Sequence, residues 1–183
     1  EFDWSLRTAY NPVGKITGSV YPDEWIMRGN HHDGWGHGAS DPISGMVSLM
    51  EEARAIGELT KTGWRPKRTL IYAGWDAEEP GLLGSTEWVE YNLNDIKEKM
   101  VVYINTDGTG VGYLSMGGSH SLEKFVNEVI RDVKDPVHNV SLDSRLRSRM
   151  RVRQYKAGAL EANKESERTD LRMYAMGAGS DYT

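Results

Sequence analysis

Three strand-like runs, each followed directly by acidic or histidine side chains, constrain the fold of this 183-residue chain more than any other feature. The runs cover residues 24–29, 69–74 and 100–106, and each has the length and the bounding residues of a buried strand. Helical periodicity fills residues 42–62 and resumes after Pro80. Because strands alternate with helices, the chain is expected to form an α/β fold whose partly parallel sheet is covered on both faces.

Further strands are expected at both ends of this alternation. Residues 10–21 alternate apolar and small side chains, and Pro22-Asp23 is typical of a turn, so the sheet is predicted to begin with an antiparallel hairpin onto residues 24–29. Residues 113–116 and 171–176 are predicted to be short strands. The predicted architecture is a three-layer α/β/α arrangement with a mixed, mostly parallel central sheet that is incomplete at its C-terminal end, in a single domain over residues 1–183.

Side chains that can bind metals follow the three central strands. In chain order, they are His31 and Asp41, Glu78 and Glu79, and Asp107. Because the carboxyl ends of parallel strands meet at one edge of a sheet, where ligands bind, these groups are expected to converge. Two adjacent carboxylates would repel each other there unless one binds a metal cation and the other stays free to take a proton from water. The chain has no cysteine, so histidine, aspartate and glutamate must hold any metal.

Each of these residues also has a purely structural interpretation. The acids within residues 76–79 are favoured at a helix N-terminus by the helix dipole. Asp41 stands directly before a proline, which is a strong helix start signal. His32 and His37 are expected to be solvent-exposed loop residues, whereas a metal is the favoured interpretation for His31 and Asp41.

Charge and hydropathy narrow the classes of function. A net charge of −5 offers no basic footprint, so nucleic-acid binding is not expected. No apolar run approaches the roughly 18 residues of a membrane-spanning helix. Every second residue from Arg145 to Arg153 is an arginine, which on a strand would align five like charges on one face. We therefore expect a solvated or partner-facing segment there, preceded by a helix that Ser119 or Ser121 caps.

Taken in order, these motifs resemble the catalytic domain of the zinc-dependent exopeptidase family that includes glutamate carboxypeptidase II, related bacterial aminopeptidases and the transferrin receptor. The resemblance covers residue 10 to the end of the chain. The segments that carry it are 29–33, 40–42, 63–66, 75–79, 81–88 and 103–107.

The resemblance implies a role for each residue of the constellation. His31 and Asp107 would hold one zinc ion, Glu79 would hold a second, and Asp41 would bridge the two. Glu78 would be the general base, taking a proton from water and delivering it to the leaving amine. The implied activity is peptide-bond hydrolysis of the aminopeptidase or carboxypeptidase type.

Other implied sites rest on fewer residues. Gly179 and Ser180 would contact the substrate, and Glu87 and Glu90 would lie near a calcium ion. The family's last zinc ligand, a histidine well beyond this stretch, has no counterpart in the chain. We therefore expect the chain to be part of a longer domain, to hold one zinc ion or none, and to be weakly active or inactive as it stands. Since Ser180 stands where glutamate carboxypeptidase II has asparagine, specificity for a C-terminal glutamate is not expected.

Two alternatives share the same fold. One is a receptor-like binding module without catalysis, and the other is a single-zinc glutaminyl cyclase. The chain keeps all five polar residues of the constellation, His31, Asp41, Glu78, Glu79 and Asp107. Because such groups are costly to bury without a partner, their presence argues against the receptor-like module. The expected partners are a peptide substrate and, through domains outside this chain, a second copy. The resemblance implies a secreted, periplasmic or membrane-anchored parent protein outside the cytoplasm.

Overall fold

The computed structural model describes residues 5–156 and 164–183, which form two compact units. The first unit comprises Glu1–Gly110 with Ala178–Thr183, and the second comprises Val111–Gly177. That the whole chain belongs to one catalytic domain stays a prediction.

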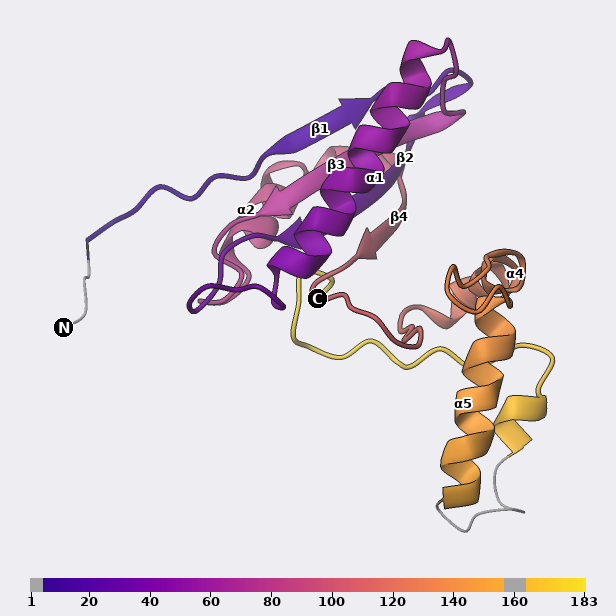
Figure 1. Ribbon diagram of the computed structural model, residues 1–183. Coiled ribbons are helices and arrows are strands. Elements are labelled where there is room, and N and C mark those ends of the chain that lie inside the picture. The colour runs from indigo at the N-terminus through magenta and orange to yellow at the C-terminus, as the bar shows by residue number, and fades with distance from the viewer. Residues whose placement is uncertain (1–4, 157–163) are drawn as a thin grey trace. The chain divides into compact units, whose positions relative to one another are not determined.

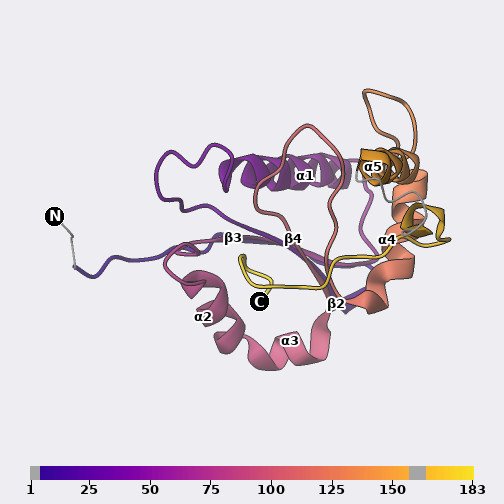
Figure 2. The same ribbon diagram turned by 90° about the horizontal axis from the view of Figure 1, so that it is seen from below.

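The first unit is a three-layer α/β/α arrangement, as predicted. Its sheet has the strand order β1-β3-β2-β4, in which β2 pairs parallel with both β3 and β4 while β1 is antiparallel to β3. Helix α1 covers one face of the sheet, and α2 and α3 cover the other (Figure 1, Figure 2). The elements are β1 (Val13–Ile16), β2 (Tyr21–His31), α1 (Ile43–Lys61), β3 (Arg68–Trp75), α2 (Leu83–Tyr91), α3 (Leu93–Lys99) and β4 (Met100–Asn105).

The core of the first unit lies between the sheet and helices α2 and α3. Alternate residues of β2 and β3 face this layer because successive side chains of a strand point to opposite faces. The rings of Trp75 and Trp88 meet there with their centroids 5.5 Å apart. The buried members of this core are Trp25, Met27, Ile71, Ala73 and Trp75.

The predicted hairpin at the start of the sheet is wrong. Strand β3 lies between β1 and β2, and Val13 pairs with Ala73 across the antiparallel ladder. Pro22 does not turn the chain but lies within β2, where the register with β3 shifts between Tyr21 and Trp25. Proline has no amide hydrogen to donate to a ladder, so it marks an irregularity in the strand as readily as a turn.

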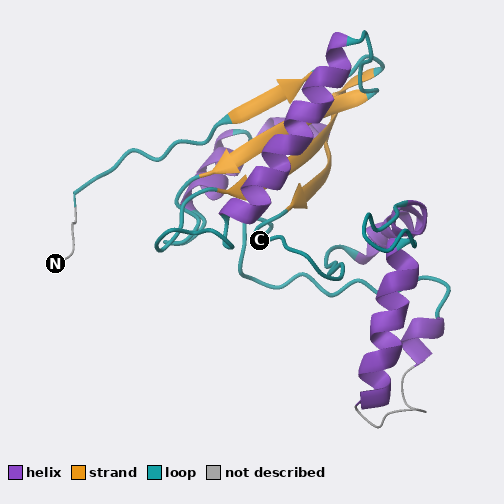
Figure 3. Ribbon diagram, in the orientation of Figure 1, coloured by secondary structure: helices purple, strands orange, loops and turns teal. Residues whose placement is uncertain are grey.

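The second unit is helical (Figure 3). Its elements are the 3-10 helix η1 (His120–Leu122), α4 (Glu123–Asp132), α5 (Leu142–Lys156) and the 3-10 helix η2 (Lys164–Glu167). Ile130, Leu146 and Leu171 form its buried core. The arginine-rich segment forms α5. The predicted helix before it is present as α4, but no side chain caps its start.

The strands predicted at 113–116 and 171–176 are absent from the described residues, where a single parallel bridge joins Gly117 to Tyr174. Buried Asn127 of α4 explains part of this difference. Its side-chain amide accepts a hydrogen bond from the Leu171 backbone N–H and donates one to the Leu171 carbonyl, both at 2.8 Å. These bonds occupy backbone groups that a sheet ladder would need.

The apolar faces predicted for the helices are only partly buried. On α1, Leu49 is buried, whereas Met50 is 59% exposed. On α4, Ile130 is buried, whereas Phe125 is exposed. In the part of the chain that the structure describes, no helix is long and apolar enough to cross a membrane.

Candidate metal centre

The predicted site residues follow the carboxyl ends of β2, β3 and β4. The parallel register places His31 opposite Trp75, and Gly29 opposite Asn105, so the three loops leave the sheet at one edge. His31 is the last residue of β2, and Asp107 follows β4 by two residues. The convergence predicted from the sequence is therefore present for these strands.

The imidazole of His31 is buried, with its side chain 1% exposed. Its Nδ1 lies 3.1 Å from the backbone carbonyl oxygen of Asp33, which can only accept a hydrogen bond. Nδ1 therefore carries the hydrogen in the neutral ring, and Nε2 presents a lone pair. Among the described residues, this Nε2 has no hydrogen-bond partner.

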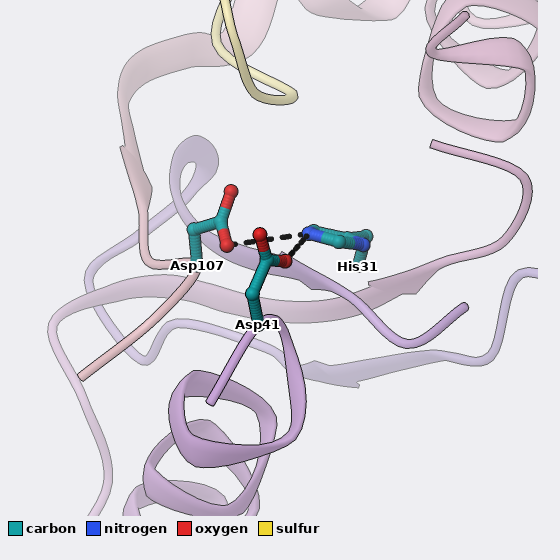
Figure 4. A group of neighbouring side chains, drawn as sticks. All are labelled: His31, Asp41 and Asp107. Atoms are coloured by element: carbon teal, nitrogen blue, oxygen red, sulfur yellow. Dashed lines mark ion pairs between the residues drawn. The ribbon is translucent and has the colours of Figure 1, made fainter. Parts of the chain in front are cut away.

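Two carboxylates face that lone pair. The Oδ1 atoms of Asp41 and Asp107 lie 3.2 Å and 3.3 Å from Nε2 of His31 (Figure 4). One ligand atom from each residue lies within 4.8 Å of the others. A buried imidazole nitrogen with two carboxylate oxygens is a donor set that zinc accepts. The residues therefore fit a divalent cation, which would satisfy the unpaired Nε2.

Close packing of α1 holds Asp107 in place. A Cβ atom on Gly45, in the first turn of α1, would lie 1.9 Å from the Asp107 carbonyl oxygen and 2.3 Å from Oδ1 of Asn30. Only glycine permits this approach. The Asn30 side chain in turn donates to the carbonyl oxygen of Pro42 at 3.2 Å, beside Asp41. The start of α1 thus joins two of the metal-facing loops.

Asp33 connects His31 to the turn that carries Glu78 and Glu79. Its Oδ1 accepts a hydrogen bond from the Glu78 amide at 2.9 Å, and its Oδ2 accepts one from the Glu79 amide at 3.2 Å. The same turn contains Ala77 at φ 56°, a left-handed conformation that is costly for a residue with a side chain. Asp33 therefore stabilises a strained turn at the site.

Charges at the site change the proton affinities of its members. Burial lowers the pKa of His31, but the charges of Asp107 and Glu78 outweigh burial and its pKa is raised. Burial raises the pKa of Glu78. Desolvation, with repulsion from Asp107, raises the pKa of Asp41. A bound cation would relieve this crowding of acids.

The sequence was compared with models of known protein families and with known proteins. Residues 11–153 match the model of peptidase family M28. This chain belongs to peptidase family M28. Several relatives of the M28 chain carry peptidase names. The M28 chain is 44% identical over 125 residues to a probable glutamate carboxypeptidase, VP8, of Zea mays. The matched residues make up 67% of this chain and 17% of that relative. This chain is 52% identical over 103 residues to aminopeptidase NAALADL1 of Mus musculus, which covers 56% of this chain and 14% of the relative.

Solved structures place the M28 chain in the same fold. A peptidase M28 precursor from Shewanella amazonensis matches with a TM-score of 0.52 and 25% identity, over 67% of this chain and 28% of that one. BSAP, a zinc aminopeptidase from Bacillus subtilis, matches with a TM-score of 0.54 and 18% identity, over 94% of this chain and 36% of that one. The M28 chain thus spans less than a fifth of the length of these curated relatives and about a third of the solved structures.

Not every predicted site residue joins the metal-facing cluster of His31, Asp41 and Asp107. In the described residues, the Glu79 carboxylate does not belong to it, so its role as a ligand stays a prediction. Glu78 lies on the other side of the ring, with Oε2 4.0 Å from Nδ1 of His31. Glu87 and Glu90 are exposed on α2, and the calcium site predicted for them stays a prediction.

The C-terminal residues of the M28 chain meet the end of β4. Ser180 is buried and its hydroxyl accepts a hydrogen bond from the Asn105 side chain at 2.8 Å, whereas Gly179 is exposed. Sequence reasoning missed Asp181, a buried carboxylate whose two oxygens lack hydrogen-bond partners within the described chain. It also missed the role of Asp33, although its position two residues after His31 was a visible signal.

Proposed function

We propose that this chain is part of the catalytic domain of a zinc-dependent exopeptidase. The observation that carries the proposal is the buried, unpartnered Nε2 of His31, which faces the carboxylates of Asp41 and Asp107. Relatives that are named carboxypeptidases and aminopeptidases support peptide hydrolysis, and likeness to a zinc aminopeptidase supports the choice of metal.

His31, Asp41 and Asp107 are the residues that would hold a zinc ion, and Glu79 is the proposed ligand of a second. Zinc supplies a Lewis acid that polarises a peptide carbonyl and increases the acidity of water. The Asp33 carbonyl fixes the tautomer of His31, because it accepts the Nδ1 hydrogen and leaves Nε2 free.

Glu78 is the proposed general base. Its side chain is 11% exposed, and burial raises its pKa, which brings its proton affinity closer to that needed for proton transfer near neutral pH. The carboxylate would accept a proton from the attacking water and return it to the leaving amine. Asp33 fixes the backbone of Glu78 and so determines where this carboxylate can lie.

The remaining expectations concern the whole protein and are proposals as well. Gly179 and Ser180 are the proposed substrate contacts, and the substrate is a peptide of the aminopeptidase or carboxypeptidase type. A location outside the cytoplasm and dimerisation through domains outside this chain follow from the resemblance alone.

Zinc binding tests the centre directly. A chromophoric chelator competes for zinc with the chain and with two variants, His31→Ala and His37→Ala. Both histidines lie in the same glycine-rich segment, but His37 is exposed and outside the cluster. His31→Ala is expected to weaken zinc binding at least tenfold, and His37→Ala to leave it unchanged. Equal zinc binding by both variants would contradict the proposed ligand set.

Hydrolysis needs a separate experiment on the longer parent protein. Amino-acid p-nitroanilides report aminopeptidase activity, and N-blocked dipeptides report carboxypeptidase activity. Glu78→Gln is expected to abolish turnover while zinc content stays normal. A parent protein that binds zinc but hydrolyses neither substrate would favour the receptor-like binding module over a peptidase.

A further inference from the structure

The second unit contains a pocket of about 820 Å³ that the proposed peptidase chemistry does not use. Its size lies in the range of ordinary ligand sites. Apolar side chains of Met116, Leu146, Met150 and Met173 line it, together with the guanidinium groups of α5. Methionine side chains are flexible and polarisable, so they accommodate apolar groups of different shapes.

Two arginines at this pocket form no ion pair with a carboxylate of the described residues. Arg149 and Arg153 both line the pocket and stand one turn apart on α5, which places like charges side by side. Within the ranges 5–156 and 164–183, neither forms an ion pair. By contrast, Arg145 pairs with Asp135, and Arg147 pairs with Asp143. The pocket therefore presents two cationic side chains that have no counter-charge among the residues that the structure describes.

Tyr113 holds one of these guanidinium groups without neutralising it. The Cζ atom of Arg149 lies 4.9 Å from the centre of the Tyr113 ring. Of the described residues that line the pocket, Glu165 alone is acidic, and it is already shared by Arg168 at 3.4 Å and Arg172 at 3.9 Å. Residues 111–177 contain 12 lysines and arginines against 9 acidic residues, although the whole chain is acidic. Charge therefore favours an anionic occupant.

The backbone that lines the pocket favours a peptide. Residues 114–116 and 172–175 lie beside each other, and within the described residues they are joined by backbone hydrogen bonds around Gly117 and Tyr174. Ser115 and Ala175 are exposed, and in the described part of the chain their backbone groups form no hydrogen bond. An extended peptide can pair with free backbone N–H and C=O groups when it binds alongside an exposed segment of chain.

We propose that this pocket binds an extended peptide segment that carries acidic side chains on either side of an apolar one. The apolar side chain enters among Met116, Met150 and Met173, and the carboxylates meet Arg149 and Arg153. Alternate residues of an extended peptide point the same way, so the three groups stand two residues apart. The site lies wholly within the second unit and is independent of the metal-facing cluster.

Isothermal titration calorimetry on the whole chain tests the proposal with acetyl-Glu-Ser-Leu-Ser-Glu-amide. Both ends are blocked, so neither an amino- nor a carboxypeptidase site recognises a free terminus. The matched probe is acetyl-Gln-Ser-Leu-Ser-Gln-amide. The acidic peptide is expected to bind at least tenfold more tightly than its neutral counterpart, and its affinity is expected to fall with added salt.

Paired variants locate the charge contacts. Arg149→Gln with Arg153→Gln is expected to reduce affinity for the acidic peptide at least tenfold. Arg151→Gln with Lys156→Gln removes the same charge from α5 at positions that do not line the pocket, and is expected to change affinity less than twofold. Far-UV circular dichroism verifies that each variant is folded.

Methyl NMR on the unchanged chain keeps the test decisive even if a variant does not fold. The acidic peptide is expected to shift the methyl signals of Met116, Met150 and Met173, and to leave those of Met46 and Met50 in the first unit unchanged. Equal affinity for both peptides, shifts confined to the first unit, or no binding at millimolar peptide would each overturn the proposal. So would a dimer that the Arg149 and Arg153 substitutions dissociate, because a second copy would then occupy the pocket.

Discussion

Gly45→Ala should damage the first unit, although the same substitution elsewhere in the same helix should stabilise it. At Gly57 of α1 an added Cβ meets no atom within 4 Å, so alanine gains about 1 kcal/mol of helix propensity. At Gly45 the added atom overlaps the Asp107 carbonyl oxygen at 1.9 Å. Because that oxygen belongs to the backbone, the loop or the helix must move, and overpacking of this kind costs about 1–3 kcal/mol.

Urea denaturation followed by tryptophan fluorescence measures the difference, because all six tryptophans lie within the first 88 residues and so report on the first unit. We expect Gly45→Ala to be about 2–4 kcal/mol less stable than Gly57→Ala. Zinc affinity should fall for Gly45→Ala alone, since the Asp107 loop is displaced. If the two variants were equally stable and bound zinc equally, the close contact between α1 and the Asp107 loop would be refuted.

Three further predictions follow from named contacts. Asp33→Asn removes one of the two oxygens that accept from the amides of Glu78 and Glu79. This change should cost about 1.5–3 kcal/mol of stability and weaken zinc binding about 10- to 100-fold. Exposed Asp23→Asn is the control, and no loss of stability or zinc affinity in Asp33→Asn would contradict the role of Asp33. Asn127→Ala leaves two buried backbone groups unpaired and should destabilise the second unit by about 2–4 kcal/mol in urea titrations followed by circular dichroism, whereas exposed Glu128→Ala should not. His138 and Arg145 lower the pKa of Asp135 from 3.8 to about 2, so the contribution of Asp135 to stability is complete above about pH 4 and is lost as pH falls through 2. Urea titrations at pH 5, 3 and 2 should show that loss of stability. Asp135→Asn should show a smaller change in stability over the same pH range.

The sequence predicts the positions of the metal-facing residues because strand ends are a local signal. Residues 69–74 and 100–106 have the composition of buried strands, and the structure places β3 and β4 within one residue of those bounds. Once these strands are parallel, the positions of His31 and Asp107 follow from chain order and from the shared edge of the sheet. For this reason the convergence could be predicted without tertiary information.

Side-chain contacts between loops are not local, and they are where prediction fails. Nothing in the composition of residues 29–45 shows that Asp33 accepts from amides 45 and 46 residues away. Likewise, no local feature of 171–176 shows that Asn127 satisfies the backbone of Leu171 and removes it from a ladder. These contacts depend on which elements pack together, which the chain determines only as a whole.

The hairpin error has the same origin, and it bears on the site. A hairpin between β1 and β2 would occupy one edge of β2, so β2 could not pair with both β3 and β4 as it does in the structure. The observed order inserts β3 between them, and this brings Trp75 beside His31. Only with that neighbour can the turn after Trp75 reach Asp33 and hold Glu78 next to the imidazole. The same insertion that defeats the local prediction therefore places the proposed base beside the metal-facing cluster.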